Sequence, residues 1–214
     1  MVRMLGVVCV VCVNLCADRF INFQDPNPRP FGAPLYASAV LPPASPPQPA
    51  TVRPQKGSEL LARLSATYAQ KPIEFENLRA VTLAMMLLES GRAQSDLARE
   101  HYNFGGLKYR PEMNGFASSV RYRASDGVDD YCKFDSIEDF LAGFWYFLDR
   151  SPYEGWRQYA HDPRRFIEFV GPIYCPFNPD YADHVMRLLP EAQALLEQHD
   201  PSYRVAELAS RMMR

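Results

Sequence analysis

The stretch from Leu83 to Lys108 reads LAMMLLESGRAQSDLAREHYNFGGLK, and it indicates how the domain is built. Its first six residues are all apolar, so a helix here has no polar side to turn toward water. Such a helix belongs in the middle of a domain. Gly91 stands where a left-handed residue commonly ends a helix. The stretch therefore predicts a central helix with Glu89 at its end.

Glu89 breaks two local rules at once. A carboxylate has the wrong charge for the C-terminal end of a helix dipole, and a buried carboxylate needs a partner. Breaks of this kind are expected at functional sites. The plainer interpretation places Glu89 on the surface, paired with Arg92 or Arg99.

Four pieces of sequence follow one another in a fixed order from the end of this helix. They are Glu89-Ser90-Gly91, Asn103-Phe104-Gly105-Gly106-Leu107-Lys108, Tyr174 and Asn178-Pro179-Asp180-Tyr181-Ala182. Together they resemble the bacterial cell-wall N-acetylglucosaminidases of glycoside hydrolase family 73, over roughly residues 79–195. The resemblance implies a mainly α (α+β) fold: a lysozyme-like helical domain with a small β-hairpin lobe that forms one wall of a substrate cleft.

The resemblance also implies roles for single residues. Glu89 is expected to be the general acid, and Tyr181 a catalytic helper, although core packing of the last helix would explain Tyr181 as well. The residues expected to bind substrate are Ser90, Asn103, Phe104 and Tyr174. A carboxyl in an apolar pocket keeps its proton near neutral pH, and Met85 and Met86 one turn back would supply such surroundings.

The second catalytic group is harder to identify. The resembled family often has a second Glu in the β-lobe, and the matching place here falls at or near Arg121. Glu112 and Asp126 are the candidates to replace it, although Asp126 also fits a turn, and Asp129-Asp130 fits a solvated hairpin edge. The alternative is substrate assistance, in which the N-acetyl group of the sugar is the nucleophile.

These residues predict hydrolysis of the β-1,4 bond after N-acetylglucosamine in peptidoglycan. A lytic transglycosylase or muramidase on the same fold is one alternative, because a single acid/base Glu suffices there. A peptidoglycan-binding domain without turnover is the other. The expected partner is the glycan strand, and the chain is expected to act as a monomer without a cofactor.

Helices and one hairpin are expected around the central helix. The predicted helices cover Ser58 to Pro72, Asn77 to Leu88 and Ser95 to Glu100, and further helices begin at Ser136, Asp162 and Asn178. Gly171-Pro172 is expected to end the helix that begins at Asp162, and Pro190 to kink or restart the last one. Two extended runs, 117–123 and 128–134, lie either side of an Asp-Gly turn and predict a β-hairpin.

The N-terminal quarter of the chain has a different composition. Residues 1–17 read as a signal peptide, with Arg3 before a short apolar core. Residues 18–57 read as a disordered spacer, because ten of the nineteen prolines fall between Asp25 and Pro54. The catalytic domain is expected over 58–200, followed by a tail at 201–214. This organisation predicts an exported, periplasmic or cell-envelope protein, with any membrane tether confined to the N-terminal segment.

Charge and cysteine usage limit the other function classes. The chain has 214 residues, a net charge of −2 and a pI near 6.1, which gives no support to nucleic-acid binding. The four histidines have no metal-ligand spacing, and no metal site is expected. In an exported domain Cys132 and Cys175 would form either a disulfide or two separate buried thiols.

Overall fold

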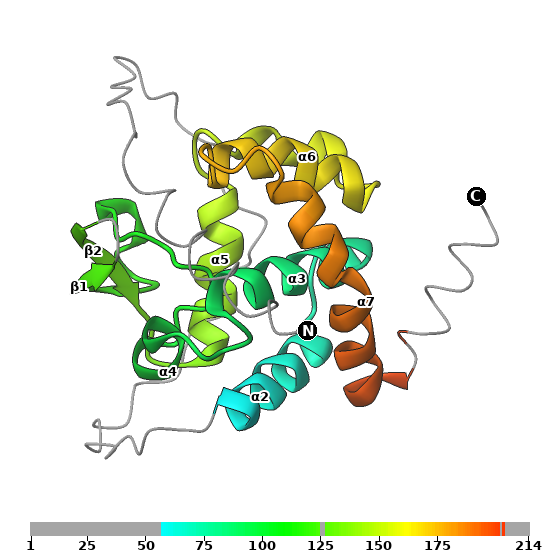
Figure 1. The fold of residues 1–214 in the computed structure, drawn as a ribbon, viewed down its shortest axis with the longest axis horizontal. Helices are drawn as coiled ribbons and strands as arrows, with labels where there is room; N and C mark the ends of the chain where they lie inside the picture. The colour runs from blue at the N-terminus through cyan, green and yellow to red at the C-terminus, as the bar shows by residue number, and fades with distance from the viewer. Residues whose placement is uncertain (1–56, 125–126, 202, 204–214) are drawn as a thin grey trace, which may run out of the picture.

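The computed structural model describes residues 57–124, 127–201 and 203. This part of the chain is mostly helical, with one antiparallel hairpin projecting from the helical body (Figure 1). The helices are α2 (Gly57–Gln70), α3 (Arg79–Ser90), α4 (Asp96–His101), α5 (Ile137–Leu148), α6 (Pro163–Tyr174) and α7 (Tyr181–His199). The strands are β1 (Ser118–Ala124) and β2 (Gly127–Lys133), and short 3₁₀ turns cover Glu76–Leu78, Pro111–Met113 and Glu154–Tyr159. The predicted fold class is confirmed.

Helix α3 is the central element, as its apolar sequence predicts. All twelve of its residues are buried, and α7 packs along it while α2 and α5 lie nearby (Figure 1). Its one buried cation, Arg79, donates to the backbone carbonyl of Tyr68 and to the carboxylate of Glu76. At the other end Gly91 adopts φ 57° and ψ 45°, so the predicted left-handed cap is confirmed.

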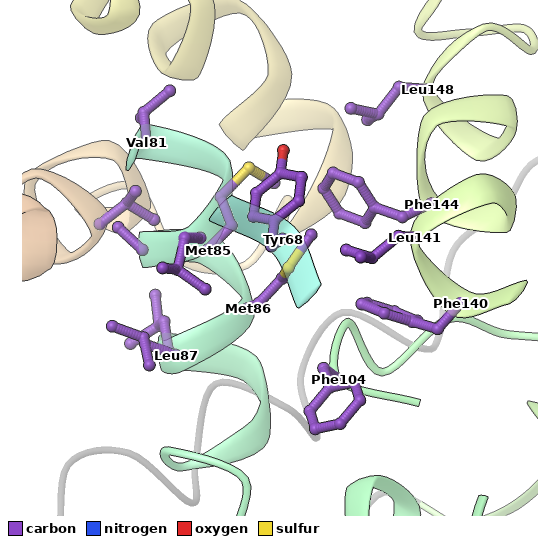
Figure 2. Close-up of a cluster of buried hydrophobic side chains, with 14 of the residues drawn as sticks. Tyr68, Val81, Met85, Met86, Leu87, Phe104, Phe140, Leu141, Phe144 and Leu148 are labelled. Carbon is purple, nitrogen blue, oxygen red and sulfur yellow. The ribbon is translucent and has the colours of Figure 1, made fainter. Parts of the chain in front are cut away.

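The core beside α3 is rich in sulfur and aromatic rings. Met85 and Met86 extend from α3 toward Tyr68 of α2 and Phe144 of α5 (Figure 2). All four side chains are fully buried. The core therefore holds α3 on several sides, and the position of Glu89 at its end follows from that packing.

The hairpin forms where the two extended runs were predicted. Its strands pair antiparallel from Ser118 opposite Lys133 to Ala124 opposite Gly127. Residues 107–109 run along the free edge of β2, where Cys132 N–H donates to the Leu107 carbonyl at 2.9 Å and Tyr109 N–H to the Asp130 carbonyl at 2.8 Å. The loop that follows α4 is thus hydrogen-bonded to the edge of the hairpin.

Helix α6 runs further than predicted. Gly171-Pro172 was expected to end it, but the helix continues to Tyr174. Pro172 lies in the last turn, so its missing N–H removes only the bond to the Glu168 carbonyl, and Cys175 N–H closes that turn by donating to the Gly171 carbonyl at 2.8 Å. The proline therefore costs one hydrogen bond without stopping the helix.

Helix α7 also differs from its prediction at two points. It begins at Tyr181 rather than at Asn178, because Asn178 forms a turn in which its side chain accepts from Asp180 N–H at 3.2 Å. The helix then runs without a restart through Pro190 to His199. Pro190 is exposed, so the carbonyl that loses its intrahelical donor can be hydrated by water.

The predicted signal peptide, most of the spacer and most of the C-terminal tail lie outside the described residues, and these remain predictions. None of the helices in the described ranges is long and apolar enough to span a membrane.

Candidate active site

Glu89 lies in the last turn of α3 and is only 5% exposed. Tyr181, at the start of α7, donates its hydroxyl proton to Glu89 Oε1 at 2.8 Å. Burial raises the pKa of Glu89 to about 7, and the hydrogen bond from Tyr181 opposes part of that rise. The interpretation of Glu89 as an exposed residue paired with Arg92 or Arg99 is wrong. The carboxyl is poised to hold or release a proton near neutral pH.

The chain after Glu89 turns through three consecutive left-handed residues, Gly91, Arg92 and Ala93. Only glycine adopts this conformation freely, and each of the other two costs roughly 1–2 kcal/mol. Ser90 helps to hold the turn, since its Oγ accepts from Ala93 N–H at 2.8 Å and donates to the Met86 carbonyl at 2.6 Å. Strained backbone of this kind persists where surrounding contacts hold it in place.

A bidentate ion pair ties the same turn to α7. Arg92 Nε and Nη2 each donate to a different carboxylate oxygen of Glu191 at 2.7 Å. The helix that carries Tyr181 is therefore fastened to the residues that follow Glu89. Arg92 stands where relatives in the resembled family often have an aromatic residue, and here it pairs with Glu191 of α7 at the surface.

Tyr174 lies beside Tyr181 in the shell around Glu89. The two rings stack with their centroids 5.9 Å apart, and Tyr174 donates its hydroxyl proton to the Gly105 carbonyl at 2.5 Å. Burial raises the pKa of both tyrosines well above 10, and the charge of Glu89 acts in the same direction. Both hydroxyls therefore stay protonated as hydrogen-bond donors over the physiological range.

Tyr153 completes this aromatic shell, and the sequence held no signal for it. Its ring centroid lies 6.2 Å from that of Tyr174, and the residue is 1% exposed. It comes from the connection between α5 and α6, about sixty residues after Glu89 in the chain. Only the fold brings it to the site.

Two glycines leave room for the tyrosines. A Cβ at Gly171 would lie 3.0 Å from the Tyr181 ring, and one at Gly105 would lie 2.9 Å from the Tyr174 hydroxyl. Larger residues at these positions would displace the rings. The two glycines therefore help to set where the hydroxyl of Tyr181 meets Glu89.

Asn103 and Phe104 occupy structural positions. The Asn103 amide donates to the carbonyls of Leu107 and Cys132, each at 2.9 Å, and its Oδ1 accepts from Leu107 N–H at 2.8 Å. Phe104 is fully buried against Phe140, with ring centroids 5.1 Å apart. Asn103 thus joins the Gly-Gly loop to β2, and sugar binding by these two residues remains a prediction.

We expect Asn103→Ala to lower the free energy of unfolding by about 2 kcal/mol, because it removes three buried hydrogen bonds at once. Denaturant unfolding of the full chain measures this, with Asn114→Ala at an exposed position as the matched control. Lost hydrolysis with unchanged stability would instead assign Asn103 to the substrate.

The carboxylates proposed as second catalytic group are each placed differently. Glu112 is 58% exposed and lies 3.9 Å from Arg150. Asp126 lies outside the described residues. On the hairpin, Asp129 pairs with Lys108 at 2.7 Å, and Asp130 lies 3.6 Å from the guanidinium of Arg121, which stands where the family often has Glu. The assignment of a second carboxylate remains a prediction.

Cys132 is a free, fully buried thiol, whereas Cys175 is disulfide-bonded, so neither a Cys132–Cys175 disulfide nor a pair of separate thiols is correct. Burial raises the pKa of this thiol to about 12, which makes it inert as a nucleophile near neutral pH. Within the described ranges, no group of three or more His, Cys, Asp or Glu side chains could hold a metal ion.

Comparison with known proteins identifies the family of the chain. A family model described as Glucosaminidase, mannosyl-glycoprotein endo-beta-N-acetylglucosaminidase, matches residues 65–194. The matched region contains Glu89 and the three tyrosines around it. No curated protein and no solved structure gives a significant match. The chain therefore belongs to the glucosaminidase family and is a glycoside hydrolase of the endo-β-N-acetylglucosaminidase type.

Proposed function

We propose that this enzyme cleaves the β-1,4 bond after N-acetylglucosamine in peptidoglycan, with Glu89 as the general acid. The observation that carries the proposal is the buried Glu89 carboxyl, whose pKa of about 7 keeps a proton available near neutral pH. That proton passes to the oxygen of the departing sugar as the glycosidic bond breaks. Water then supplies a hydroxyl group to the anomeric carbon and a proton that restores Glu89.

Tyr181 is proposed as a positioning residue in this reaction. Its hydroxyl contacts Glu89 Oε1, which leaves Oε2 as the oxygen that can face the substrate. Because the donated bond favours the ionised carboxyl, it also lowers the pKa of Glu89. The tyrosine thus sets both the orientation of the acid and the pH at which it loses its proton.

Substrate assistance is the mechanism favoured for the second half of the reaction. Each described hairpin carboxylate, Asp129 or Asp130, has a cationic neighbour, and Glu112 is exposed beside Arg150. In this mechanism the N-acetyl oxygen attacks the anomeric carbon and forms a cyclic intermediate, which water then opens. Only one protein acid is then required.

The test is digestion of purified peptidoglycan by the full chain, followed by borohydride reduction and mass spectrometry of the products. We expect reduced N-acetylglucosamine at the new ends. Reduced muramic acid ends would instead indicate a muramidase, and anhydromuramic ends a lytic transglycosylase. Retained binding without any product would indicate a wall-binding domain.

We expect Tyr181→Phe to lower kcat and to move the alkaline limb of the pH–rate profile upward by about one pH unit. The variant loses the hydrogen bond that stabilises ionised Glu89, so the carboxyl keeps its proton to higher pH. The measurement is kcat/KM against pH, with Tyr159→Phe in another part of the domain as control. An unchanged limb would remove Tyr181 from this role.

We also propose that the enzyme acts outside the cytoplasm, as a monomer on the glycan strands of the cell envelope. The support is the sequence of residues 1–57, with its signal-like start and proline-rich spacer. Fractionation of cells that express the full chain tests the location. Recovery of the whole protein in the cytoplasm would contradict the proposal.

A further inference from the structure

One face of the β-hairpin turns toward the shell around Glu89. Cys132 N–H bonds to the Leu107 carbonyl, and the Leu107 side chain lies beside Gly105, whose carbonyl accepts from Tyr174. The Cys132 thiol lies near enough to Tyr174 for its ionised form to raise the pKa of that phenol, which is raised chiefly by burial. The face of β2 that carries the Cys132 side chain is therefore the face nearest to Tyr174.

Two arginines share this face with Cys132. Side chains alternate along a strand, and the register pairs Ser119 with Cys132, Arg121 with Asp130, and Arg123 with Val128. Arg121 and Arg123 thus lie on the same face, roughly 7 and 14 Å further along the hairpin than Cys132. Both side chains are exposed.

A third arginine, Arg150, follows α5 and lies near both Cys132 and Phe147. Its guanidinium carbon is 4.4 Å from the centre of the Phe147 ring, and that ring lies 6.0 Å from Tyr174. The Arg150 side chain is 16% exposed, and its buried Nε has no hydrogen-bond partner. Its charge also opposes the rise that burial causes in the pKa of Cys132.

The positive charges on this face are only loosely compensated. Asp130 lies 3.6 Å from Arg121, and Glu112 lies 3.9 Å from Arg150, so both pairs are longer than a close ionic hydrogen bond. The ion pairs of the hairpin within the described ranges, Lys108–Asp129 and Arg121–Asp130, do not include Arg123. Three arginines set against Asp130 and Glu112 leave these neighbours with one more positive than negative charge, although the whole chain is slightly acidic.

We propose that Arg121, Arg123 and Arg150, the arginine face, bind the carboxylates of the stem peptides that branch from peptidoglycan strands. A chain of N-acetylated amino sugars is neutral, so an arginine-lined wall is useful only when the glycan carries acidic branches. Guanidinium groups match carboxylates in geometry and charge. The inference rests on the proposed function and specifies which glycan the enzyme prefers.

Binding can be tested separately from hydrolysis. Full-length Glu89→Gln is mixed with insoluble peptidoglycan that hydrofluoric acid has freed of phosphate polymers, and the bound fraction is measured at low and high salt. The double variant Arg121→Gln/Arg123→Gln is added in the same background. Two probes without carboxylates accompany it: peptidoglycan whose carboxylates have been coupled to ammonia with a carbodiimide, and chitin.

We expect the double variant to bind untreated peptidoglycan about three- to tenfold more weakly than its parent at low salt. The difference between the two proteins should shrink at high salt. Binding to amidated peptidoglycan and to chitin should not change. The control Arg164→Gln/Arg187→Gln, which removes two positive charges from α6 and α7, should bind like its parent. Arg150 is left intact because its guanidinium also packs on Phe147.

Equal binding by the double variant and its parent on untreated peptidoglycan would overturn the inference. An equal loss on the amidated material would do so as well, because the contact would then not involve carboxylates. The proposed function is tested separately, by the products that the wild-type enzyme releases from peptidoglycan. Charge-dependent binding without those products would reject the proposed reaction and keep the arginine face.

Discussion

Glu89→Gln is expected to lower the rate of glycan hydrolysis by about 10²–10⁴-fold, the usual contribution of a general acid. Gln has nearly the same shape and still accepts a hydrogen bond from Tyr181, but it has no proton to give to the departing sugar. The fold around the site should therefore be kept while the chemistry is lost. The measurement is kcat/KM on soluble glycan fragments of peptidoglycan.

The matched control is Glu168→Gln, on the exposed side of α6. Glu168 pairs with Arg164 at the surface, and that pair has no contact with the aromatic shell around Glu89. Its removal should leave kcat/KM unchanged. If Glu89→Gln retained more than about a tenth of the wild-type rate, Glu89 could not be the general acid.

The same substitution should raise the stability of the enzyme above neutral pH. The pKa of Glu89 is about 7 in the folded chain, against 4.5 for an ordinary Glu as in the unfolded chain. The folded chain therefore holds this proton more tightly. As pH rises from 4.5 to 7, this preference is lost and the free energy of unfolding falls by about 3 kcal/mol. Gln does not titrate and avoids that loss.

Denaturant unfolding at pH 4.5 and at pH 8 tests this expectation. The difference in free energy of unfolding between Glu89→Gln and the wild type should shift by about 3 kcal/mol in favour of the variant from pH 4.5 to pH 8. Any effect of the amide that is the same at both pH values cancels in this comparison. Glu168→Gln should show no comparable difference. An equal stability change for Glu89→Gln at both pH values would mean that Glu89 titrates normally in the folded chain.

These two results together would show a trade between stability and activity at one carboxyl. Burial against the core makes the ionised form unfavourable, and the same burial keeps the proton available for the leaving group. The left-handed turn at Gly91–Ala93 adds local strain directly after it. Both features cost stability at the place where the reaction requires a fixed, partly protonated acid.

Local sequence determined most of the elements. The apolar run from Leu83 to Leu88, the glycine at position 91 and the serines at 95 and 136 predicted where helices begin and end. Two extended runs on either side of the Asp-Gly turn predicted the hairpin. These signals act over a few residues, so they can be read without knowing what packs against them. The predictions from proline were wrong at two places. Pro172 lies in the last turn of α6, and Pro190 is exposed on α7, so neither ends its helix.

Tertiary structure decided the chemistry of the site. Glu89 and Tyr181 are 92 residues apart, and neither their 2.8 Å contact nor the presence of Tyr153 beside them follows from any local pattern. Asn103 matched a substrate-binding segment in sequence, yet its amide is used to hold the loop against β2. The sequence by itself determined that an acidic residue ends a central helix. Its pKa depends on burial by residues from distant parts of the chain, and only the folded arrangement supplies that burial.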